Sequence, residues 1–459
     1  MTPEDGPILV GNNLAVVIAA HELAKHGRAV TLLTDSRPLG GHFAGITIDG
    51  DNFDMGMVLL EQHAPACPGA DLRDFGPHIR NDWTRFGDRG SAWLEAQGAL
   101  VRTPTPQALH DNEIVPDYLI ANRLDAFANA PVSSPPTLDR DDARHAANKA
   151  LPGCYDSLSY GEAARLNHGS ELHARFIEPY ARKVLGVSSN DFLARYHRAG
   201  WLPLYHPGTL SAALRGEPVG LPEYPFYTTA CGFVGAIVRQ IEARLGAMPN
   251  VAVVNEPVVS LARREQSWEV GTAGRLWRSA DLVLGLPPER CHALLGLGPL
   301  APAQAASVTV FFTRVRAGAI KRPLGCLMVV DDDYASYRVC DQDALAGLTP
   351  EWRRVVVEAS PERLAGRYPG LTPEAALQSE LCNLMQLDAK DAIEPLRCIT
   401  ARNALPLPTP EGIAAAMLAH ETVVTALPDA RLTGSLLGYG VASFNDQLIQ
   451  ALKIAQELA

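Results

Sequence analysis

The chain has 459 residues, of which 47% are hydrophobic and 20% are charged, so it is long enough for two domains. Its net charge of −11, without any basic stripe, argues against nucleic acid as a partner and otherwise favours solubility. We expect a cytoplasmic protein, in which thiols are reduced. The eight cysteines are scattered without a C-x-x-C pair, which predicts reduced thiols and no metal site. We expect no membrane span, because no stretch is long, apolar and free of charge.

The N-terminal residues have the pattern of a β-α-β unit. Residues 8–10 are apolar, residues 11–13 form a turn, and apolar residues then recur at helical spacing until Gly27 ends the helix. Residues 29–33 form a second apolar run, which is typical of a buried strand. A unit of about 30 residues in this order has the proportions of a dinucleotide-binding unit, but a purely structural β-α-β unit has the same pattern.

The middle of the chain alternates between helical and extended patterns. A segment rich in Pro, Ser and Asp predicts a linker at residues 131–142. The apolar spacing predicts helices at residues 151–205 and 232–245, and strands or hairpins at residues 251–254, 261–278 and 281–286. Four further runs predict an antiparallel sheet: residues 308–314, 327–330, 337–339 and 354–358.

The C-terminal residues follow a strand, turn and helix order. A strand at residues 432–434 precedes a glycine-rich turn, and a helix is expected over residues 445–458. Such a turn presents N–H groups to an anion or a carbonyl at the helix start, although an ordinary connecting turn has the same pattern. Because this helix and the β-α-β unit each have an apolar face without a local partner, we predict that both ends of the chain build one domain.

The first turn matches the dinucleotide fingerprint G-x-G-x-x-G only in part. Gly11 occupies the first position, whereas Asn13 and Val16 replace the second and third glycines. The Cβ atom of Asn13 is expected to crowd a phosphate, and Val16 to push the helix away from the strand. At the end of the second strand, Thr34 stands where an acid should bind ribose; Asp35 either takes that role or begins the loop.

Four segments together resemble the superfamily of FAD-dependent amine oxidases, protoporphyrinogen oxidases and UDP-galactopyranose mutases. They are Gly11-Asn12-Asn13, Gly40-Gly41, Phe53-Asp54-Met55-Gly56 and the C-terminal segment from Gly434-Ser435 onward. The resemblance spans nearly the whole chain in order. It implies FAD as cofactor, with these binding residues: Gly11, Asn12, Asn13, Asp35, Gly40, Gly41, Phe53, Gly56, Gly434, Ser435, Gly440 and Ala442.

Finer features are similar to the mutase-like branch of this superfamily. They are Phe75-Gly76-Pro77-His78-Ile79 with Arg80-Asn81-Asp82, and Gly438-Tyr439-Gly440 followed by Asn445-Asp446-Gln447. Ser435 departs from the mutase pattern, which has an arginine there.

The resemblance implies an α/β fold, with a Rossmann-like FAD-binding domain built from both chain ends and an inserted α+β substrate domain that contains the antiparallel sheet. We assign residues 1–75, 225–300 and 400–459 to the first domain. Residues 76–224 and 301–399 are assigned to the substrate domain, which includes a helical part.

The function implied is that of a FAD-dependent oxidoreductase acting on a small polar metabolite such as a sugar derivative. A redox-neutral, mutase-like rearrangement of a nucleotide sugar and a flavin-free, non-catalytic scaffold are the alternatives, and a homodimer stays open. Catalytic residues stay unassigned, with four candidates: His78, Arg80, Arg338 and Tyr439. A nucleotide-sugar substrate needs arginines for its diphosphate and aromatic platforms. The candidates are Arg80, Arg85, Arg182, Arg338 and Arg402, with Tyr180, Trp201, Tyr205, Tyr337 and Tyr439.

Overall fold

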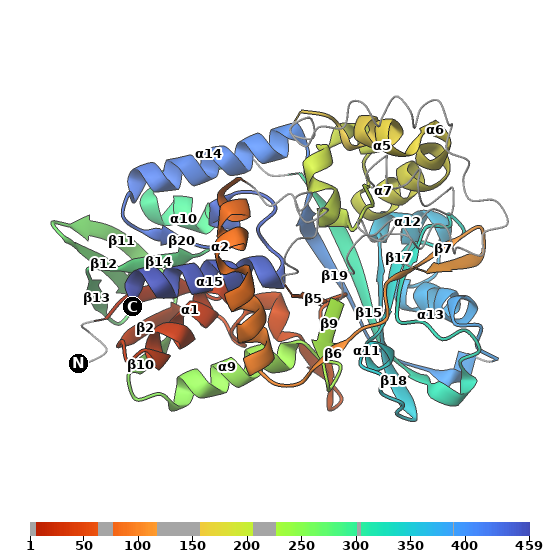
Figure 1. The fold of residues 1–459 in the computed structure, drawn as a ribbon, viewed down its shortest axis with the longest axis horizontal. Coiled ribbons are helices and arrows are strands. Elements are labelled where there is room, and N and C mark those ends of the chain that lie inside the picture. The colour runs from red at the N-terminus through yellow and green to blue at the C-terminus, as the bar shows by residue number, and fades with distance from the viewer. Residues whose placement is uncertain (1–5, 63–76, 117–156, 205–225, 301–303, 389) are drawn as a thin grey trace.

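The computed structural model describes residues 6–62, 77–116, 157–204, 226–300, 304–388 and 390–459 (Figure 1). Within α2 (Pro77–Ala96), only the backbone is described for residues 77–84. The expected linker at residues 131–142 therefore lies outside the described residues. Among the described helices, none is both long and apolar enough to cross a bilayer.

A five-stranded parallel sheet forms one half of the molecule (Figure 1). Its strands, in spatial order, are β10 (Val251–Asn255), β2 (Val30–Thr34), β1 (Ile8–Gly11), β14 (Leu282–Gly285) and β20 (Arg431–Leu432). All four pairings are parallel. Each strand lies within or next to an apolar run of the sequence, because a parallel sheet covered on both faces selects continuous apolar strands.

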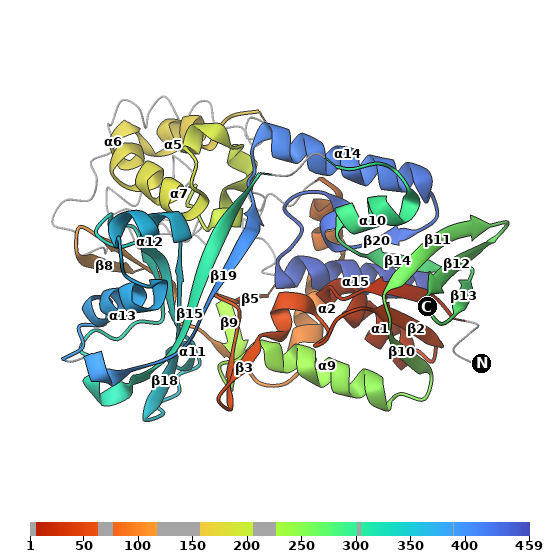
Figure 2. The same ribbon diagram turned by 180° about the vertical axis from the view of Figure 1, so that it is seen from behind.

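The two faces of this sheet have separate cores. Leu9 belongs to a core beneath the helices α1 (Leu14–Lys25), α9 (Gly235–Ala247) and α15 (Phe444–Leu458). Its neighbours Ile8 and Val10 belong to the opposite core, because successive strand residues point to opposite faces. Helices α1 and α15 pack side by side, so the two ends of the chain lie together (Figure 2).

The opposite face is covered by a three-stranded meander and two helices. The elements are β11 (Val258–Arg264), β12 (Ser267–Thr272), β13 (Leu276–Ser279), α10 (Pro288–Leu295) and α14 (Pro410–Ala426). The single hairpin expected at residues 261–278 is therefore wrong in its strand count. Its first strand begins earlier, and a second turn creates β13.

A seven-stranded sheet forms the other half of the molecule (Figure 1). Its strands, in spatial order, are β19 (Ile393–Pro406), β15 (Ala305–Arg316), β18 (Trp352–Ala359), β17 (Ser336–Asp341), β16 (Cys326–Val329), β7 (Gln107–His110) and β8 (Glu113–Pro116). Only the β16–β7 pairing is parallel. The four antiparallel strands expected from the sequence are present. Strand β19 runs across residue 400, where the sequence analysis placed a domain boundary.

Helices cover both faces of this second sheet. Val310 and Phe312 of β15 face a core that includes residues of α5 (Tyr160–His168) and α7 (Glu178–Leu185). Phe311 and Val315 face the opposite core, beneath α12 (Pro361–Arg367) and α13 (Pro373–Leu384).

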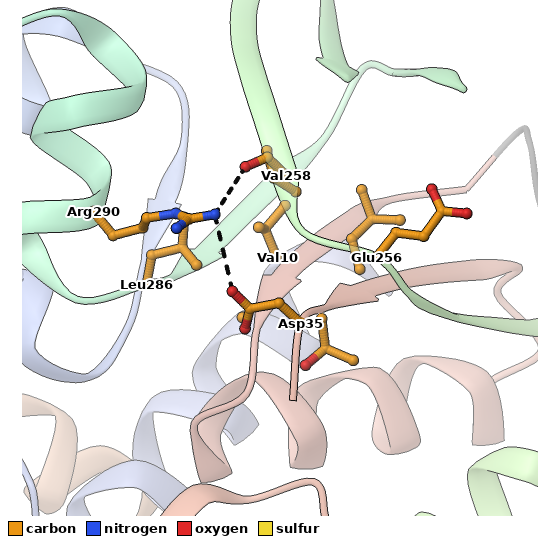
Figure 3. A pocket seen from close by; sticks show the side chains of 9 residues that line it. Val10, Asp35, Glu256, Val258, Leu286 and Arg290 are labelled. Carbon is orange, nitrogen blue, oxygen red and sulfur yellow. Dashed lines mark hydrogen bonds and ion pairs between the residues drawn. The ribbon is translucent and has the colours of Figure 1, made fainter. Parts of the chain in front are cut away.

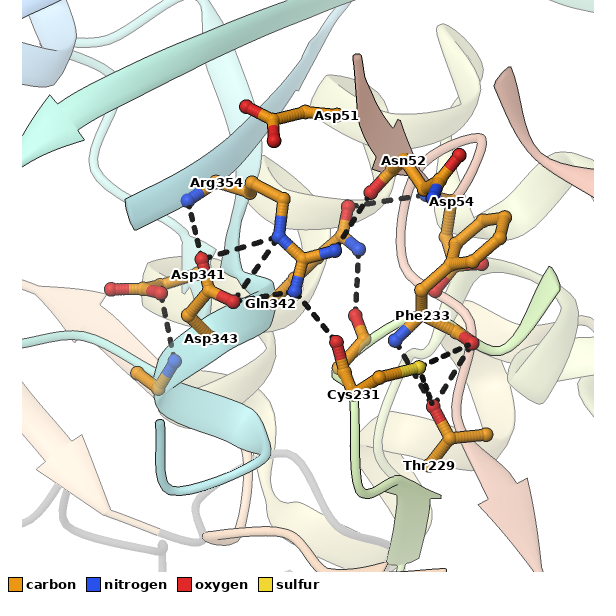
Figure 4. Close-up of polar contacts among 12 residues, drawn as sticks. Asp51, Asn52, Asp54, Thr229, Cys231, Phe233, Asp341, Gln342, Asp343 and Arg354 are labelled. Carbon is orange, nitrogen blue, oxygen red and sulfur yellow. Dashed lines mark hydrogen bonds and ion pairs between the residues drawn. The ribbon is translucent and has the colours of Figure 1, made fainter. Parts of the chain in front are cut away.

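A buried polar network joins the two halves (Figure 4). Arg354 of β18 binds Asp343 in the short helix α11 (Gln342–Leu345), with Nε 3.1 Å from Oδ1. It also donates to the carbonyls of Asn52 in β4 (Asp51–Phe53), at 2.9 Å, and of Cys231, at 2.7 Å. Gln342 accepts from Asp54 N at 3.1 Å. One guanidinium thus bonds to three segments that are distant in the sequence.

Candidate functional site

The turns identified from the sequence gather at the carboxyl edge of the parallel sheet. Gly11 is the last residue of β1, where the turn begins, and has a φ of 127°. A Cβ atom there would lie 2.5 Å from the carbonyl oxygen of Gly285 in β14. Gly11 is therefore required by the close approach of two strands as well as by the turn.

Asn13 is the N-cap residue of helix α1, and its side chain forms hydrogen bonds with other residues of the chain. Its Oδ1 accepts from Val16 N at 2.9 Å, as an N-cap residue does. Its Nδ2 donates to Thr433 Oγ1 at 3.0 Å and to Gly285 O at 3.2 Å. The amide points into the protein, where it links the end of β1 to β14 and to Thr433, which follows β20. The crowding of a phosphate by the Cβ atom of Asn13 stays a prediction.

Val16 is fully buried in the first turn of α1. A Cβ atom on Gly285 would lie 2.3 Å from its Cγ2. The expectation that Val16 pushes the helix off the sheet is therefore wrong, because glycine on the neighbouring strand makes the room that glycine on the helix would make in the full fingerprint.

Asn12 holds the loop that carries Gly40 and Gly41. Its Oδ1 and its carbonyl oxygen both accept from Gly40 N, each at 3.1 Å. Its Nδ2 donates to Ser36 Oγ at 2.8 Å and to Pro38 O at 3.1 Å. The structure thus brings Asn12, Gly40 and Gly41 together, as the resemblance implied.

The C-terminal turn joins the same edge through two buried glutamines of α15. Gln447 Oε1 accepts from Ala15 N at 3.2 Å, and its Nε2 donates to Ala442 O at 3.2 Å. Gln450 accepts from Gly434 N at 2.8 Å and donates to Val441 O at 3.0 Å. The sequence analysis missed Gln450 and gave Gln447 no bonding role. Amides on the buried face of an otherwise apolar helix were the available signal.

The predicted cofactor residues Gly434, Ser435 and Gly440 of this turn differ in their burial. Gly434 is so close to Asn13 that a Cβ atom on it would lie 2.6 Å from Nδ2. Ser435 is exposed and Gly440 is half-buried. Of these three residues, only Gly434 is buried.

A pocket lies at the carboxyl edge of the parallel strands (Figure 3). Its walls include apolar side chains, and its polar groups come from Thr34, Asp35, Glu256 and Arg290. Arg290 Nη2 lies 3.9 Å from Asp35 Oδ2 and donates to Val258 O at 3.3 Å. Asp35, the sequence candidate for ribose binding, therefore lines a pocket together with Gly11, and the sequence analysis missed Glu256 and Arg290.

The Phe53–Gly56 segment lies between the two halves of the molecule. Phe53 is fully buried, and its ring packs edge to face on Phe312, with centroids 5.6 Å apart. Asp54 accepts from Val234 N and Gly235 N at the start of α9, each at 3.0 Å. Burial raises the pKa of Asp54 to about 6, although the two backbone hydrogen bonds and nearby arginines oppose that shift.

Arg338 forms an ion pair inside the protein. Its Nε lies 2.9 Å from Glu358 Oε2, and both side chains are buried. Burial alone would lower its pKa, but Glu358 keeps it above the ordinary arginine value. Glu358 in turn lies against Gly56, where a Cβ atom would be 2.7 Å from its Oε1. Glu358 therefore forms an ion pair with Arg338 through Nε, and the role of Arg338 as a diphosphate clamp stays a prediction.

The other aromatic and basic candidates are dispersed. Tyr180 of α7 and Tyr337 of β17 are fully buried in the core on one face of the seven-stranded sheet, and Trp201 packs on Phe226. Three arginines lie outside the pocket, at exposed positions: Arg85, Arg182 and Arg402. Three candidate side chains lie outside the described residues: His78, Arg80 and Tyr205.

Tyr439 lies in the C-terminal turn and contacts the end of β19. Its hydroxyl donates to Pro406 O at 2.9 Å, at the end of β19. Its ring packs edge to face on Tyr196, with centroids 4.8 Å apart. Burial raises the pKa of Tyr439 above its ordinary value, so the phenol is neutral at physiological pH.

The described residues contain no group of three or more His, Cys, Asp and Glu side chains arranged to hold a metal ion. The polar side chains that meet at the carboxyl edge are instead mainly amides, which link the turns to one another. This edge, with its adjoining pocket, is the candidate functional site.

No protein-family model and no curated protein matches the chain. Among solved structures, a reduced UDP-galactopyranose mutase has a TM-score of 0.67 at 12% identity, covering 99% of this chain and 95% of that chain. A protein assigned as a protoporphyrinogen oxidase from Exiguobacterium sp. 255-15 has a TM-score of 0.64 at 16% identity, covering 100% and 99%. A putrescine oxidase bound to putrescine has a TM-score of 0.58 at 14% identity, covering 99% and 98%. The chain therefore has the fold of the FAD-dependent amine oxidase-like superfamily, to which these oxidases and the mutase belong.

Proposed function

We propose that the chain is a FAD-dependent oxidoreductase that acts on a small polar metabolite such as a sugar derivative. The observation that carries the proposal is the convergence of the start of α1, the Gly40-Gly41 loop and the C-terminal turn at the carboxyl edge of one parallel sheet. This edge is where open α/β sheets bind nucleotides.

The lining of the pocket offers groups suited to the nucleoside end of such a cofactor. Val10 and Leu33 offer an apolar wall, and the carboxylates of Asp35 and Glu256 are acceptors suited to ribose hydroxyls. One oxygen of Glu256 is buried and has no hydrogen-bond partner among the described residues. A buried acceptor without a partner is costly, and a ribose hydroxyl would satisfy it.

The start of α1 fits the pyrophosphate. A helix N-terminus offers N–H groups and a partial positive charge to an anion. Ala15 N already donates to an oxygen acceptor there, the amide of Gln447. We propose that the backbone at Ala15 and the loop at Gly41 hold the phosphates, with Asp35 and Glu256 on the ribose.

In this proposal the flavin supplies the redox chemistry, by taking up a hydride from the substrate. The protein binds and orients both molecules and excludes water. We propose residues 1–75, 225–300 and 400–459 as the cofactor domain and residues 76–224 and 301–399 as the substrate domain. Tyr439, a neutral phenol between β19 and the C-terminal turn, is the described candidate for contact with substrate.

A redox-neutral rearrangement of a nucleotide sugar is the second candidate. It is favoured by the TM-score of 0.67 to the mutase, which exceeds that to the putrescine oxidase. The pairing of Arg338 with Glu358 counts against it, because the guanidinium of the expected diphosphate clamp already forms an ion pair through Nε.

The test begins with the absorption spectrum of the purified protein, before and after incubation with FAD. A bound flavin is expected to absorb in the visible range and to be released by denaturation as FAD. Anaerobic bleaching by a polar substrate, with colour restored by an electron acceptor, would support the oxidoreductase. Turnover of a nucleotide sugar by reduced enzyme alone would favour the rearrangement. A protein that takes up no flavin would overturn both and leave the scaffold alternative.

A further inference from the structure

The side chain of Gln447 connects the starts of the two helices that meet at the carboxyl edge. It lies on α15, where it is 5% exposed, yet it bonds across to α1 through Ala15 N. Its amide nitrogen returns to Ala442 O, in the turn that precedes its own helix. A backbone N–H in the first turn of α1 thus donates to a side chain 432 positions away in the sequence.

The oxygen of Gln447 accepts a hydrogen bond from Ala15 N, a donor that a phosphate oxygen could also use. The first N–H groups of a helix have no partner within the helix, and they bind anions, capping side chains or water. In α1, Val16 N is satisfied by the N-cap Asn13, and Ala15 N is satisfied by Gln447. A pyrophosphate that used Ala15 N would therefore have to replace the amide oxygen of Gln447.

We infer that Gln447 is a built-in competitor for the cofactor's phosphate: its amide oxygen binds Ala15 N at the start of α1 and must be displaced when FAD binds. This inference rests on the proposed function. It assigns to Gln447 a positioning role that the sequence pattern of glycines does not contain. It also predicts that Ala442 O loses its partner on binding, so that the C-terminal turn responds to the cofactor.

The experiment compares the full-length protein with Gln447→Ala, using FAD binding measured by flavin fluorescence and thermal unfolding measured without flavin. Gln447→Ala leaves Ala15 N–H without an acceptor in the flavin-free protein, so the Tm is expected to fall. The same change removes the competitor, so the Kd for FAD is expected to fall by about tenfold. If Gln447 had a purely structural role, Gln447→Ala would lower the Tm and would also weaken FAD binding, so that the Kd would rise.

Two further variants sharpen the comparison. Gln447→Glu keeps the shape but places a carboxylate on Ala15 N–H, so FAD binding is expected to weaken by at least about tenfold through repulsion of the pyrophosphate. Gln450→Ala is the matched control. It lies one turn later on α15 with 4% exposure and bonds equivalently, but to Gly434 N and Val441 O. It is expected to lower the Tm without tightening FAD binding.

The outcomes separate this inference from the proposed function. If wild type binds FAD and Gln447→Ala binds it no more tightly, the competitor role is overturned and the flavoprotein proposal stands. Equal tightening by Gln450→Ala would also overturn it, because the effect would then reflect loosening of α15. If neither wild type nor Gln447→Ala takes up FAD, the proposed function fails as well. Flavin uptake by Gln447→Ala, with little by wild type, would support the inference most directly.

Discussion

Gly285 and Val16 form a residue pair that lets helix α1 pack on the sheet although two of the three fingerprint glycines are absent. Glycine on the strand accommodates valine on the helix, with 2.3 Å between Val16 Cγ2 and the position of an added Cβ atom. We therefore predict that Gly285→Ala lowers the free energy of unfolding by about 1–3 kcal/mol through overpacking. Adding Val16→Ala should recover part of this loss, which a double-mutant cycle with denaturant unfolding would measure. Strictly additive costs would contradict the pairing.

The same geometry predicts the effect of restoring the full fingerprint. Asn13→Gly together with Val16→Gly removes an N-cap, a link to β14 and Thr433, and a buried side chain. We expect a loss of several kcal/mol in stability, since cap loss costs about 0.5–2 kcal/mol and core truncation about 2–5 kcal/mol. Urea unfolding of the double variant checks this, with Asn12→Gly as the comparison. An unchanged midpoint would mean that these contacts contribute little.

Glu22 is the residue whose ionisation should control stability at low pH. It is buried beside His21 and Trp93, whose Nε1 donates to it at 2.9 Å. Burial would raise the pKa of Glu22, but these hydrogen bonds lower it to about 2, below its ordinary value of 4.5. A depressed folded pKa gives stability that is present above pH 4.5 and is lost as the pH falls toward 2, by about 3 kcal/mol.

Asp54 and Asp341 act in the opposite direction, because burial raises the pKa of each to about 6 from 3.8. Their contribution changes between pH 3.8 and 6, so neither of them affects the pH dependence below pH 3.8. In that range the comparison with Glu22→Gln isolates Glu22. We expect the Tm of wild type to drop steeply in that range and the Tm of Glu22→Gln to drop less. Parallel curves for the two proteins would rule out this role of Glu22.

At the scale of single elements, helix α9 depends on a cap from a distant segment. Its N-terminal amides at Val234 and Gly235 both donate to Asp54, about 180 residues earlier in the chain. We predict that Asp54→Ala costs about 2–4 kcal/mol, because two buried N–H groups lose their acceptor. Asp54→Asn should cost less, since its one amide oxygen still accepts. Denaturant unfolding of both variants would test this, and equal losses would argue against the cap.

At the scale of the whole molecule, Arg354 links β18 of the seven-stranded sheet to β4 and to the segment that precedes α9 (Figure 4). We predict that Arg354→Ala costs about 3–5 kcal/mol, because Asp343 is left buried without its partner. The two halves should then unfold in separate steps in calorimetry. Arg353→Ala is the neighbouring control, because Arg353 pairs with Asp341 at 3.2 Å on the same side of the junction. A single transition in both variants would show that Arg354 does not couple the halves.

Much of the architecture could be predicted from the sequence because it follows from local patterns. Continuous apolar runs such as residues 8–10 and 281–286 identified parallel strands, and the four β-rich runs identified antiparallel ones. Strand β19 was not predicted, because its exposed edge residues break the alternation that a half-buried strand usually shows. The terminal helix was placed within one residue of its start at Phe444.

The roles of individual site residues were decided only by the tertiary structure. Asn13 bonds to Thr433 across 420 positions, and Arg338 is neutralised by Glu358 on a neighbouring strand. The sequence by itself determined most of the segments that turn, extend or coil, because those choices depend on neighbours a few positions away. Whether a side chain faces a cofactor or another part of the chain depends on which distant backbone lies opposite it, and only the packing of the two chain ends decides that.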